Sequence, residues 1–600
     1  MTKTKYIFSL LVSLLLCLSS QAGIHQYAEQ SILSEGNWVK VRVSGTGVCR
    51  MHFDQIRQAG LNPQQLRVFG YGGAQLEQDF TKTKIDDLPQ VPVYVGDDYV
   101  LFWVQGPYSW QYSGSRFMHT RNTYSNYGYY FLTDNSGEMM AMPYAEEISG
   151  TPTDVYTYTN YQVHESDSIN LVDKDGKSGG GKHFYGETFS VNEKMVFSFN
   201  TPNAIEGEMG SAYIDVAAYS AYSSSFTISI NNSTKQAISI APYGNDHFVR
   251  ANVGALNMRG SMAANKQEVA LTMQCSSVNA TGWLNYIELI TPCSLQMNGS
   301  WLPIRSTVNY KNSTPIRFHL QGANEHTHIW DVTNKAAIKR VPTTMQGEEM
   351  VWVGSQQQGI SEFVAVNTQA NSEWITAEVM GKVPNQNLHA LRNIDYVIIC
   401  ADGYQSIAEQ LAKAHQEKEG ITWAVVTEEE VFNEFSSGTP DATAYRWLMK
   451  MLYDRADGSN AKPRWLLLMG HGTFDNRKLL GERSGSRILL SYQSNNSVHE
   501  VTAYGTDDYF GFLDDNEGAI DTQGRMDIGV GRLPINNTTE AQEVVDKLIR
   551  YIRNEQPGKW KNQIIFLADD GDGGSHTETA EGGAERVRLN NPDFVVNKIY

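Results

Sequence analysis

The sequence predicts a multidomain protein in which an all-β, sandwich-like region precedes an α/β region with a parallel sheet. The chain has 600 residues, enough for about three or four domains that each have their own core. Residues 24 to 385 alternate apolar and polar residues in short runs between turn residues. After residue 390, continuous apolar runs alternate with helical patterns, which is typical of a parallel sheet covered by helices.

Residues 1–22 form a predicted secretory signal peptide. Lys3 and Lys5 precede a short apolar run, and small residues follow up to Ala22, after which we expect cleavage. The mature protein is therefore expected outside the cytoplasm. No later stretch has the run of about 20 apolar residues that a membrane helix needs.

The β region is expected to hold two domains, an N-terminal β domain at residues 23–175 and a second β-rich domain at residues 176–385. Runs such as "WVKVRVSGTG", "MVFSFNTP" and "SFTISINNS" alternate with period two, as strands with one buried face do. The stretch "KDGKSGGGK" at residues 174–182 is interpreted as a linker or loop between the two.

The α/β region is expected to contain helices with identifiable starts. Ser406 and Glu409 have the spacing of a capping box, and Thr439 with Pro440 forms a cap and first-turn pair. A third helix is predicted to begin at Thr538. The expected strands are residues 395–401, 421–426, 465–469, 526–534, 564–568 and 595–600.

Charge and cysteine content exclude some classes of function. The formal charge of -18 and the pI near 5.3 argue against a nucleic-acid binder, which needs a basic patch. Past the signal the cysteines are too sparse for a disulfide scaffold. Cys275 and Cys293 could pair across a hairpin, whereas Cys400 is predicted to pack as a small buried hydrophobe. The chain has no CxxC or HExxH motif, so a zinc site has little support.

His471 is the most prominent candidate for catalysis by its position. It lies between two glycines in "RWLLLMGHGTFDNR", directly after a predicted buried strand, where α/β sheets bind their ligands. An imidazole there could act as a general base, or it could simply cap a turn. A base needs a nucleophile, and no cysteine follows Cys400 in the chain.

Two acidic clusters are further candidates. The run "GTDDYFGFLDDNEG" supplies oxygen ligands that suit calcium, although its spacing fits no helix-loop-helix consensus and a solvated acidic loop explains it equally well. The second run, "ADDGDGG", contains Asp570, which could orient a histidine, bind calcium or turn the chain. The candidate calcium ligands are Asp507, Asp508, Asp514 and Asp515.

Several long motifs in fixed order resemble the C25, gingipain-type, cysteine peptidase family. They include "DYVIICADGYQSIAEQLAKAHQEKEGITWAVVT", "RWLLLMGHGTFDNR", "YGTDDYFGFLDDNEG", "MDIGVGRLPINNTTEAQEVVDKLIRYIRNE" and "IIFLADDGD". Within this family, the motifs are similar to those of the sortases of the type IX secretion system. In the β region, "VKVRVSGTGVCRMHFDQIRQAGLNPQQLRVFGYGG" and "DDYVLFWVQGP" are similar to the amino-terminal part of those sortases.

The resemblance implies that residues 390–600 form a caspase-like α/β peptidase domain that is incomplete at its C-terminal end. The family uses a Cys/His dyad, and both dyad residues are expected beyond Tyr600. An acid after the strand "IIFLA" orients the histidine in the family, and Asp570 occupies the best-matching position, with Asp569 one residue away. Relatives commonly have Asp in the turn of His471, so the resemblance implies that His471 is structural.

The implied function is that of a cysteine-type endopeptidase and transpeptidase on the outer-membrane surface of a Gram-negative bacterium. It would remove the C-terminal sorting domain from exported cargo and transfer the cargo to an anionic lipopolysaccharide through an acyl-enzyme. An outer-membrane β-barrel protein would anchor it, and it would need no cofactor apart from possible structural calcium. The alternative is a non-catalytic secreted protein that uses a peptidase-like half-domain for binding or assembly.

Overall fold

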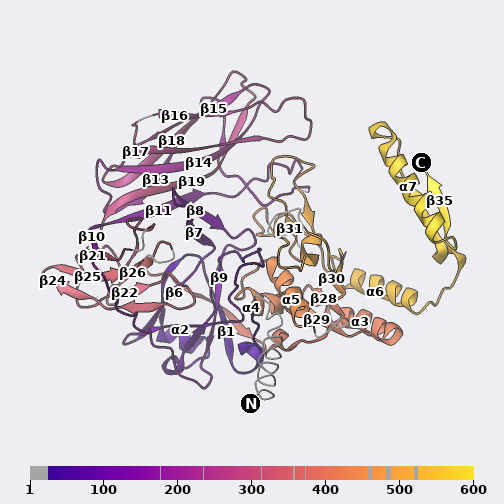
Figure 1. The fold of residues 1–600 in the computed structure, drawn as a ribbon, viewed down its shortest axis with the longest axis horizontal. Helices are drawn as coiled ribbons and strands as arrows, with labels where there is room; N and C mark the ends of the chain where they lie inside the picture. Colours follow the sequence, from indigo (N-terminus) through magenta and orange to yellow (C-terminus); the bar gives the residue numbers. More distant parts are fainter. Residues whose placement is uncertain are drawn as a thin grey trace, which may run out of the picture.

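The structure, a computed structural model, contains three β units and one α/β unit (Figure 1). The predicted signal peptide, residues 1–22, lies outside the described residues. No helix in the described part of the chain is long and apolar enough to cross a membrane. The structure describes residues 25–175, 178–233, 235–311, 314–355, 359–371, 373–456, 463–481, 488–518 and 524–600.

The first β unit packs a five-stranded sheet against a three-stranded sheet, with the short helix α2 (Phe53–Gln58) beside them. Apolar side chains of both sheets form one core between them. The hairpin of β7 (Tyr108–Tyr112) and β8 (Phe117–Arg121) extends from this unit. In sheet order the strands are β27 (Glu378–Val383), β1 (Trp38–Val43), β9 (Gly128–Thr133), β3 (Arg67–Phe69) and β4 (Gln90–Val91), and then β2 (Gly47–His52), β6 (Tyr99–Val104) and β5 (Tyr94–Val95).

The second β unit is an antiparallel sandwich of long strands. Alternate residues of each strand point into an apolar core that includes Phe226, Leu271 and Ile287. In sheet order the strands are β11 (Thr157–Glu165), β19 (Thr281–Ser294), β14 (Met209–Tyr219) and β17 (Asn252–Ser261), with β12 (Thr188–Phe189) on β19, and then β13 (Lys194–Thr201), β18 (Asn265–Cys275), β15 (Ser224–Ile230) and β16 (Lys235–Ile240).

The third β unit is a smaller sandwich whose core includes Phe318, Trp352 and Phe363. In sheet order its strands are β10 (Thr153–Val155), β21 (Ile316–Gln321), β25 (Glu349–Gly354) and β24 (Thr344–Gln346), and then β20 (Trp301–Arg305), β26 (Glu362–Asn367), β22 (Thr327–Asp331) and β23 (Lys339–Val341). The all-β, multidomain prediction is therefore confirmed.

The predicted division of the β region does not coincide with these sheets. A boundary at residue 175 would cut the second sandwich, because β11 pairs along its whole length with β19. The segment before residue 385 returns to the first unit, where β27 pairs with β1. The alternating pattern identifies the strands, but it cannot identify which strands pair across more than a hundred residues.

The described end of the glycine-rich stretch, residues 178–182, is a packed loop and not a free linker. A Cβ atom on Gly179 would lie 2.4 Å from the ring of Phe474, and one on Gly181 would lie 2.1 Å from the carbonyl oxygen of Asn496. The amide of Lys182 also donates to the carbonyl of Ser494 at 2.9 Å. The glycines therefore allow this loop to lie directly against the α/β unit.

The α/β unit has a four-stranded parallel sheet in the order β29 (Trp423–Thr427), β28 (Tyr396–Cys400), β30 (Trp465–Met469) and β33 (Gly529–Leu533). Each of these strands overlaps one of the predicted strand ranges. The helices are α3 (Gln405–Glu419), α4 (Glu428–Phe435), α5 (Thr443–Asp454) and α6 (Thr538–Ile552), and short strands β31 (Tyr492–Gln493) and β32 (Gly505–Thr506) follow β30.

Two of the predicted helix starts are wrong. Helix α3 begins at Gln405, so Ser406 lies inside it and forms no capping box. The hydroxyl of Thr439 donates to the carbonyl of Gly72 at 3.0 Å, and α5 begins four residues later, where Asp441 accepts a hydrogen bond from the amide of Thr443. A contact with the first β unit thus replaces the local cap. The predicted start of α6 at Thr538 is confirmed.

The first β unit contributes directly to the core of the α/β unit. Leu76, Phe80 and Tyr124 belong to the same apolar cluster as the parallel sheet and its helices. Asp441 accepts a hydrogen bond from the amide of Leu76 at 2.9 Å, and the Nζ of Lys40 lies 2.7 Å from a carboxylate oxygen of Glu429. Residues of the first β unit therefore complete the hydrophobic core of the α/β unit.

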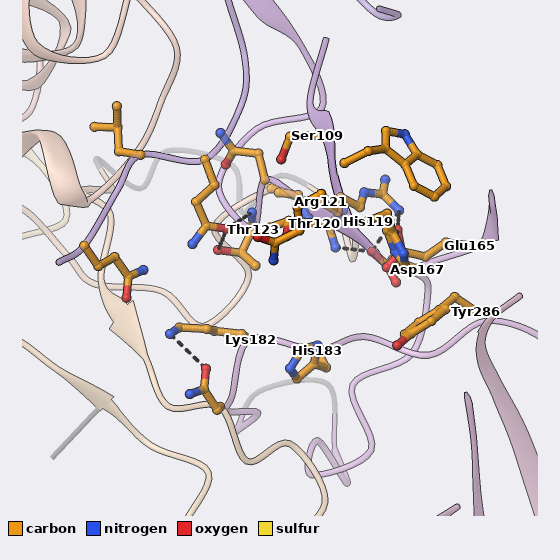
Figure 2. A pocket seen from close by; sticks show the side chains of 18 of the residues that line it. Ser109, His119, Thr120, Arg121, Thr123, Glu165, Asp167, Lys182, His183 and Tyr286 are labelled. Atoms are coloured by element: carbon orange, nitrogen blue, oxygen red, sulfur yellow. Dashed lines mark hydrogen bonds and ion pairs between the residues drawn. The ribbon is translucent and has the colours of Figure 1, made fainter. Parts of the chain in front are cut away.

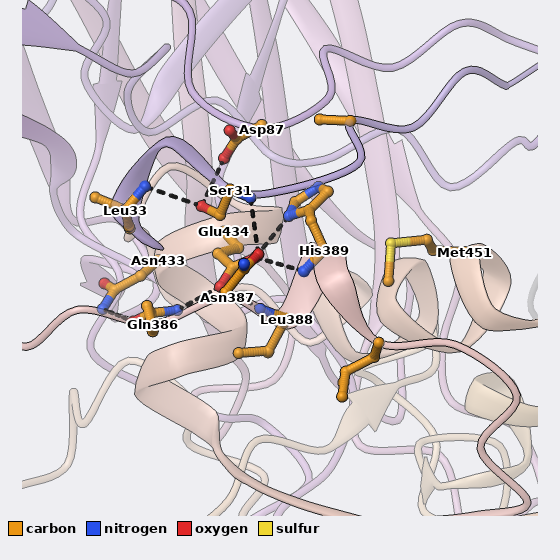
Figure 3. Close-up of polar contacts among 12 residues, drawn as sticks. Ser31, Leu33, Asp87, Gln386, Asn387, Leu388, His389, Asn433, Glu434 and Met451 are labelled. Atoms are coloured by element: carbon orange, nitrogen blue, oxygen red, sulfur yellow. Dashed lines mark hydrogen bonds and ion pairs between the residues drawn. The ribbon is translucent and has the colours of Figure 1, made fainter. Parts of the chain in front are cut away.

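A buried histidine also joins them (Figure 3). His389 is completely buried, with Nδ1 2.6 Å from Glu434 and Nε2 3.2 Å from Asp86. Burial opposes the charged form of His389, but the hydrogen bonds with Asp86 and Glu434 outweigh burial and raise its pKa to about 9. The imidazolium is therefore held between one carboxylate from each unit.

The last elements, β34 (Gln563–Leu567), α7 (Ser575–Asn590) and β35 (Val595–Ile599), form a separate layer beyond α6 (Figure 1). The sequence predicted β34 as a strand of the main sheet. Instead β34 pairs in parallel with β35 in a two-stranded sheet. The apolar pattern predicts a parallel partner, and it cannot specify which strand that partner is.

Replacing His389 with Gln should make the stability of the chain less dependent on pH. Because the folded pKa of His389 is raised above its unfolded value near 6.5, its contribution is complete below that pH and is lost as pH rises through about 9. The contribution is about 3 kcal/mol. Melting temperatures of wild type, His389→Gln and the exposed control His247→Gln between pH 6 and 10 test this. A wild-type advantage that stays constant would contradict it.

Gly181→Ala should destabilise the chain more than Gly207→Ala. Both glycines have a left-handed φ, +80° and +85°, so both variants carry the same backbone strain. Only the Cβ at position 181 meets a neighbour, the Asn496 carbonyl, whereas nothing lies within 4 Å at position 207. We expect an additional loss of about 1 to 3 kcal/mol at position 181, measured by denaturant unfolding. Equal losses would show that the loop does not press against the α/β unit.

Candidate active site

The strands of the parallel sheet end together at its carboxyl edge. The backbone ladder continues one residue past the strands: the amide of Ala401 donates to Met469, and that of Gly470 donates to Leu533, both at 3.0 Å. The turns after β28, β30 and β33 therefore adjoin one another. This edge is where open α/β sheets bind their ligands.

Two strand ends that carry polar residues meet at this edge. Asp402 follows β28 and His471 follows β30, and these strands are neighbours in parallel register. Residues 569–573 do not join them, because β34 lies in the separate two-stranded sheet. The acidic residues after β34 therefore do not adjoin the edge that carries His471.

His471 has the contacts of a turn residue. Its Nδ1 contacts the carbonyl oxygen of the next residue, Gly472, and its own carbonyl accepts a hydrogen bond from the amide of Leu489 at 2.9 Å. Within the described ranges, no carboxylate or thiol bonds its ring. The turn leaves no room for a side chain at position 472, where a Cβ would lie 2.7 Å from the hydroxyl of Ser491. The interpretation of His471 as structural agrees with this geometry and stays a prediction.

Arg532 of β33 holds this edge together. Its guanidinium donates to both carboxylate oxygens of Asp507, at 2.7 and 2.8 Å, and to the carbonyls of Gly470 and Leu490 at 3.3 and 3.0 Å. It thereby joins the acidic loop, the segment before β31 and the turn of His471. Sequence reasoning missed Arg532, whose signal is a single arginine within the apolar run "IGVGRLP".

Glu428 is a second residue that sequence reasoning missed at this edge. It follows β29 and accepts a hydrogen bond from the hydroxyl of Tyr445 at 2.8 Å. Burial raises the pKa of Glu428 to about 7, although the Tyr445 hydrogen bond lowers it. A carboxyl group that titrates near neutral pH is a common feature of functional edges. Its sequence signal is the position directly after a predicted strand.

The four described cysteines are free, and three of them are buried and poor nucleophiles. Burial raises the pKa of Cys293 to about 11 and that of Cys400 to about 12, and it raises the pKa of Cys49 still further. Cys400 packs in the core as predicted. The predicted pair of Cys275 and Cys293 does not form, because Cys293 lies twelve residues along β19, about 40 Å from the start of that strand.

The predicted calcium ligands do not converge on one point. Asp507 is bonded to Arg532, and Asp515 lies 2.6 Å from the Nζ of Lys450. Only Asp514 lies in an acidic cluster, with ligand oxygens within 4.8 Å of those of two other residues, Glu517 and Asp527. The cluster therefore contains Asp514 but not Asp507, Asp508 or Asp515, which were also predicted as ligands. Calcium binding stays a prediction.

Asp570 lies after β34, as expected, and is exposed. Its neighbour Asp569 makes the contact with a histidine: its carboxylate lies 2.6 Å from Nδ1 of His576, whose Nε2 lies 3.3 Å from Asp572. The hydrogen bond with Asp569 raises the pKa of His576. The role of Asp570 as an orienting acid stays a prediction.

The comparisons with known proteins agree with this fold. Residues 389–600 match the model of peptidase family C25. The crystal structure of dimeric latent PorU from Porphyromonas gingivalis is similar, with a TM-score of 0.78 and 30% identity over 90% of this chain and 51% of that chain. This chain therefore spans about half the length of the PorU structure. No curated protein matches.

Two further solved structures are much less similar. One described as the structure of a protease has a TM-score of 0.24 and 15% identity over 35% of this chain and 40% of that one. The other is the CBM36-1 domain of a multidomain xylanase from the hindgut metagenome of Trinervitermes trinervoides. It has a TM-score of 0.15 and 13% identity over 22% of this chain and 96% of that one.

These findings cover both the β region and the parallel sheet. The PorU match extends over nine tenths of the chain, so it includes the three β units, and the family match begins at His389, where the α/β unit starts. The chain is therefore a PorU-like protein with a gingipain-type region of peptidase family C25 at residues 389–600.

Proposed function

We propose that the chain acts in a cell-surface cysteine peptidase of the sortase kind, within the type IX secretion system. It would remove the C-terminal sorting domain of exported cargo proteins and transfer the cargo to an anionic lipopolysaccharide. The similarity to PorU carries this proposal, because it covers the β units as well as the C25 region at 30% identity.

The chemistry would pass through an acyl-enzyme. A thiolate attacks the scissile carbonyl and expels the sorting domain, a histidine moves the protons, and water or an acceptor amine then releases the cargo. Cys49, Cys293 and Cys400 are poor sources of this thiolate, because burial raises the pKa of each. Cys275 is half-buried in the second sandwich, beside the hydroxyl of Ser220.

The proposed location is the outer face of the outer membrane, with a β-barrel protein as anchor. The predicted signal peptide supports export. The β units support a role beyond catalysis, because the first of them contributes residues to the core of the C25 region. They would position cargo and anchor relative to the carboxyl edge.

A non-catalytic role in binding or assembly is the second candidate. The observation that favours it is the same burial of the cysteines. The two candidates differ in what happens to cargo. A peptidase changes the mass of the cargo, whereas an assembly protein changes only the amount that reaches the surface.

Disruption of the gene in its own bacterium separates the two. We expect secreted cargo to keep its C-terminal sorting domain, which mass spectrometry of the secreted proteins detects. Reintroducing the gene should restore trimming. Cargo that is trimmed normally but secreted in smaller amounts would contradict the peptidase proposal and favour the assembly role.

His471→Asp should leave trimming near the wild-type level in the complemented strain, because His471 contacts only the backbone of its own turn. Asp570→Asn should lower trimming about tenfold or more if this carboxylate orients the catalytic histidine. Asp569→Asn is the matched control, since it changes the residue next to Asp570 and breaks the contact between Asp569 and His576. Loss of trimming in His471→Asp with normal folding would contradict the structural role of His471, and a greater loss in Asp569→Asn would move the orienting role to Asp569.

A further inference from the structure

A cavity of about 690 Å³ lies where three parts of the chain meet (Figure 2). The hairpin of β7 and β8 lies on one side of it, the end of β11 and the segment at residues 182–184 on another, and the loop after β30 on a third. Small-molecule sites in proteins commonly have volumes between about 300 and 1,000 Å³. The cavity therefore has the size of a site for a small organic molecule.

A series of ion pairs runs along one wall of the cavity and continues beyond it to Glu288 and Arg116. Carboxylates alternate with cations along it, from the loop after β30 through the hairpin to β19. Figure 2 shows its central members together on one side, with Lys182 and His183 apart from them. In order the members are Arg477, Asp167, Arg121, Glu165, His119, Glu288 and Arg116.

This series of ion pairs begins and ends with a cation. Four cations share three carboxylates, because His119 is charged at neutral pH: burial lowers its pKa, but hydrogen bonds with Glu165 and Glu288 outweigh that and raise it to about 9. At one end, Arg116 is partly exposed and lies over the ring of Tyr213, 3.5 Å from the ring centre. The other end is therefore the place where an additional negative charge is favourable.

Arg477 is that other end, and its side chain is only 3% exposed. Among the described residues it pairs with one carboxylate, Asp167, and it shares this carboxylate with Arg121, which lies 2.9 Å from the same side chain. The Nη1 of Arg477 and the Nε of Arg121 are both buried, and neither has a hydrogen-bond partner among the described residues. A buried guanidinium N–H without an acceptor is unfavourable. Both N–H groups are closed off from solvent, so a small movement of either side chain toward the cavity would bring it to an acceptor there.

The remaining lining favours a polar molecule. Amide and hydroxyl groups of Gln75, Gln111 and Thr120 face the cavity together with the rings of Trp110 and Tyr286. Guanidinium groups match the oxygens of phosphate and carboxylate better than any other side chain. In a chain of formal charge -18, a concave site whose guanidinium groups keep N–H donors without acceptors favours anions.

We propose that this cavity binds a small polar organic molecule through an oxyanion, phosphate or carboxylate, which accepts hydrogen bonds from Arg477 and Arg121. The proposal does not depend on peptidase activity. It has a consequence for the candidate active site, because Arg477 lies six residues after His471 on the same loop. Asp475 caps the amides of Leu479 and Leu480 in this loop at 2.8 and 2.7 Å, so a bound anion would further immobilise it.

Isothermal titration of the purified chain tests the proposal with four probes: inorganic phosphate, glucose 6-phosphate, glucuronate and glucose. We expect the sugar phosphate or the uronate to bind more tightly than inorganic phosphate, and glucose not to bind. Arg477→Lys and Arg121→Lys keep the charge but lose the planar donor pair, and each should weaken binding about tenfold or more. Arg317→Lys, on the exposed surface of the third sandwich, should bind as the wild type does.

Hydrogen exchange of the wild-type chain keeps the proposal testable if the variants fold poorly. Bound glucose 6-phosphate should protect amides of residues 474–481 and of β8, and not those of the third sandwich. Failure of every anion to bind at millimolar concentration would overturn the proposal. Binding that survives in Arg477→Lys and Arg121→Lys, or protection confined to another surface, would overturn it as well.

Discussion

The arrangement of the units depends on the hydrogen bonds that the guanidinium of Arg446 donates. It is completely buried, and each of its nitrogens donates to a backbone carbonyl: Nη1 to Gln78 at 2.8 Å, Nε to Phe512 at 2.7 Å and Nη2 to Glu517 at 2.8 Å. The ring of Phe80 lies against the guanidinium, and its centre is 3.8 Å from the Cζ atom of Arg446. One charged group thereby joins the first β unit, helix α5 and the acidic loop. Removing an acceptor from a buried charged group is strongly destabilising, so each of the three partners contributes to the stability of this arrangement.

This constraint explains why α5 is buried on every side. A helix packed on a parallel sheet normally keeps one polar face toward solvent, but here residues 76–80 of the first β unit cover that face. Arg446 and Lys450 would otherwise be exposed, and both are buried with partners. The carboxyl edge is fixed from outside in the same way, because Arg532 bonds the acidic loop that Arg446 also holds. The β units thus position the candidate site as well as surround it.

Much of the fold was predictable because its information is local. Apolar runs of strand length identified the four strands of the parallel sheet, and Asn537 at the start of α6 is followed by a strongly amphipathic helix. The resemblance of long motifs predicted the family that the comparisons support. Local signals failed where a distant residue competes for the same group. Thr439 bonds Gly72 instead of capping α5, and the glycines at residues 179–181 allow close packing instead of flexibility.

The candidate site was predictable only in part for the same reason. The position of His471 at the carboxyl edge follows from the strand that precedes it. The roles of Arg532 and Arg477 do not, because each depends on acids that are 25 and 310 residues away in the sequence. Asp507 was predicted as a calcium ligand from its neighbours in the acidic run, whereas the folded chain pairs it with an arginine. Charge pairing across long separations is invisible in a single sequence.

The most direct measurement is the thermal unfolding of residues 385–600 expressed without the β units. If the first β unit completes the core of the C25 region, this fragment lacks Leu76, Phe80 and the acceptor for one arm of Arg446. We predict that it shows no cooperative unfolding transition and binds dyes specific for exposed apolar surface. A fragment that unfolds cooperatively, at the melting temperature of the same region in the whole chain, would contradict this account.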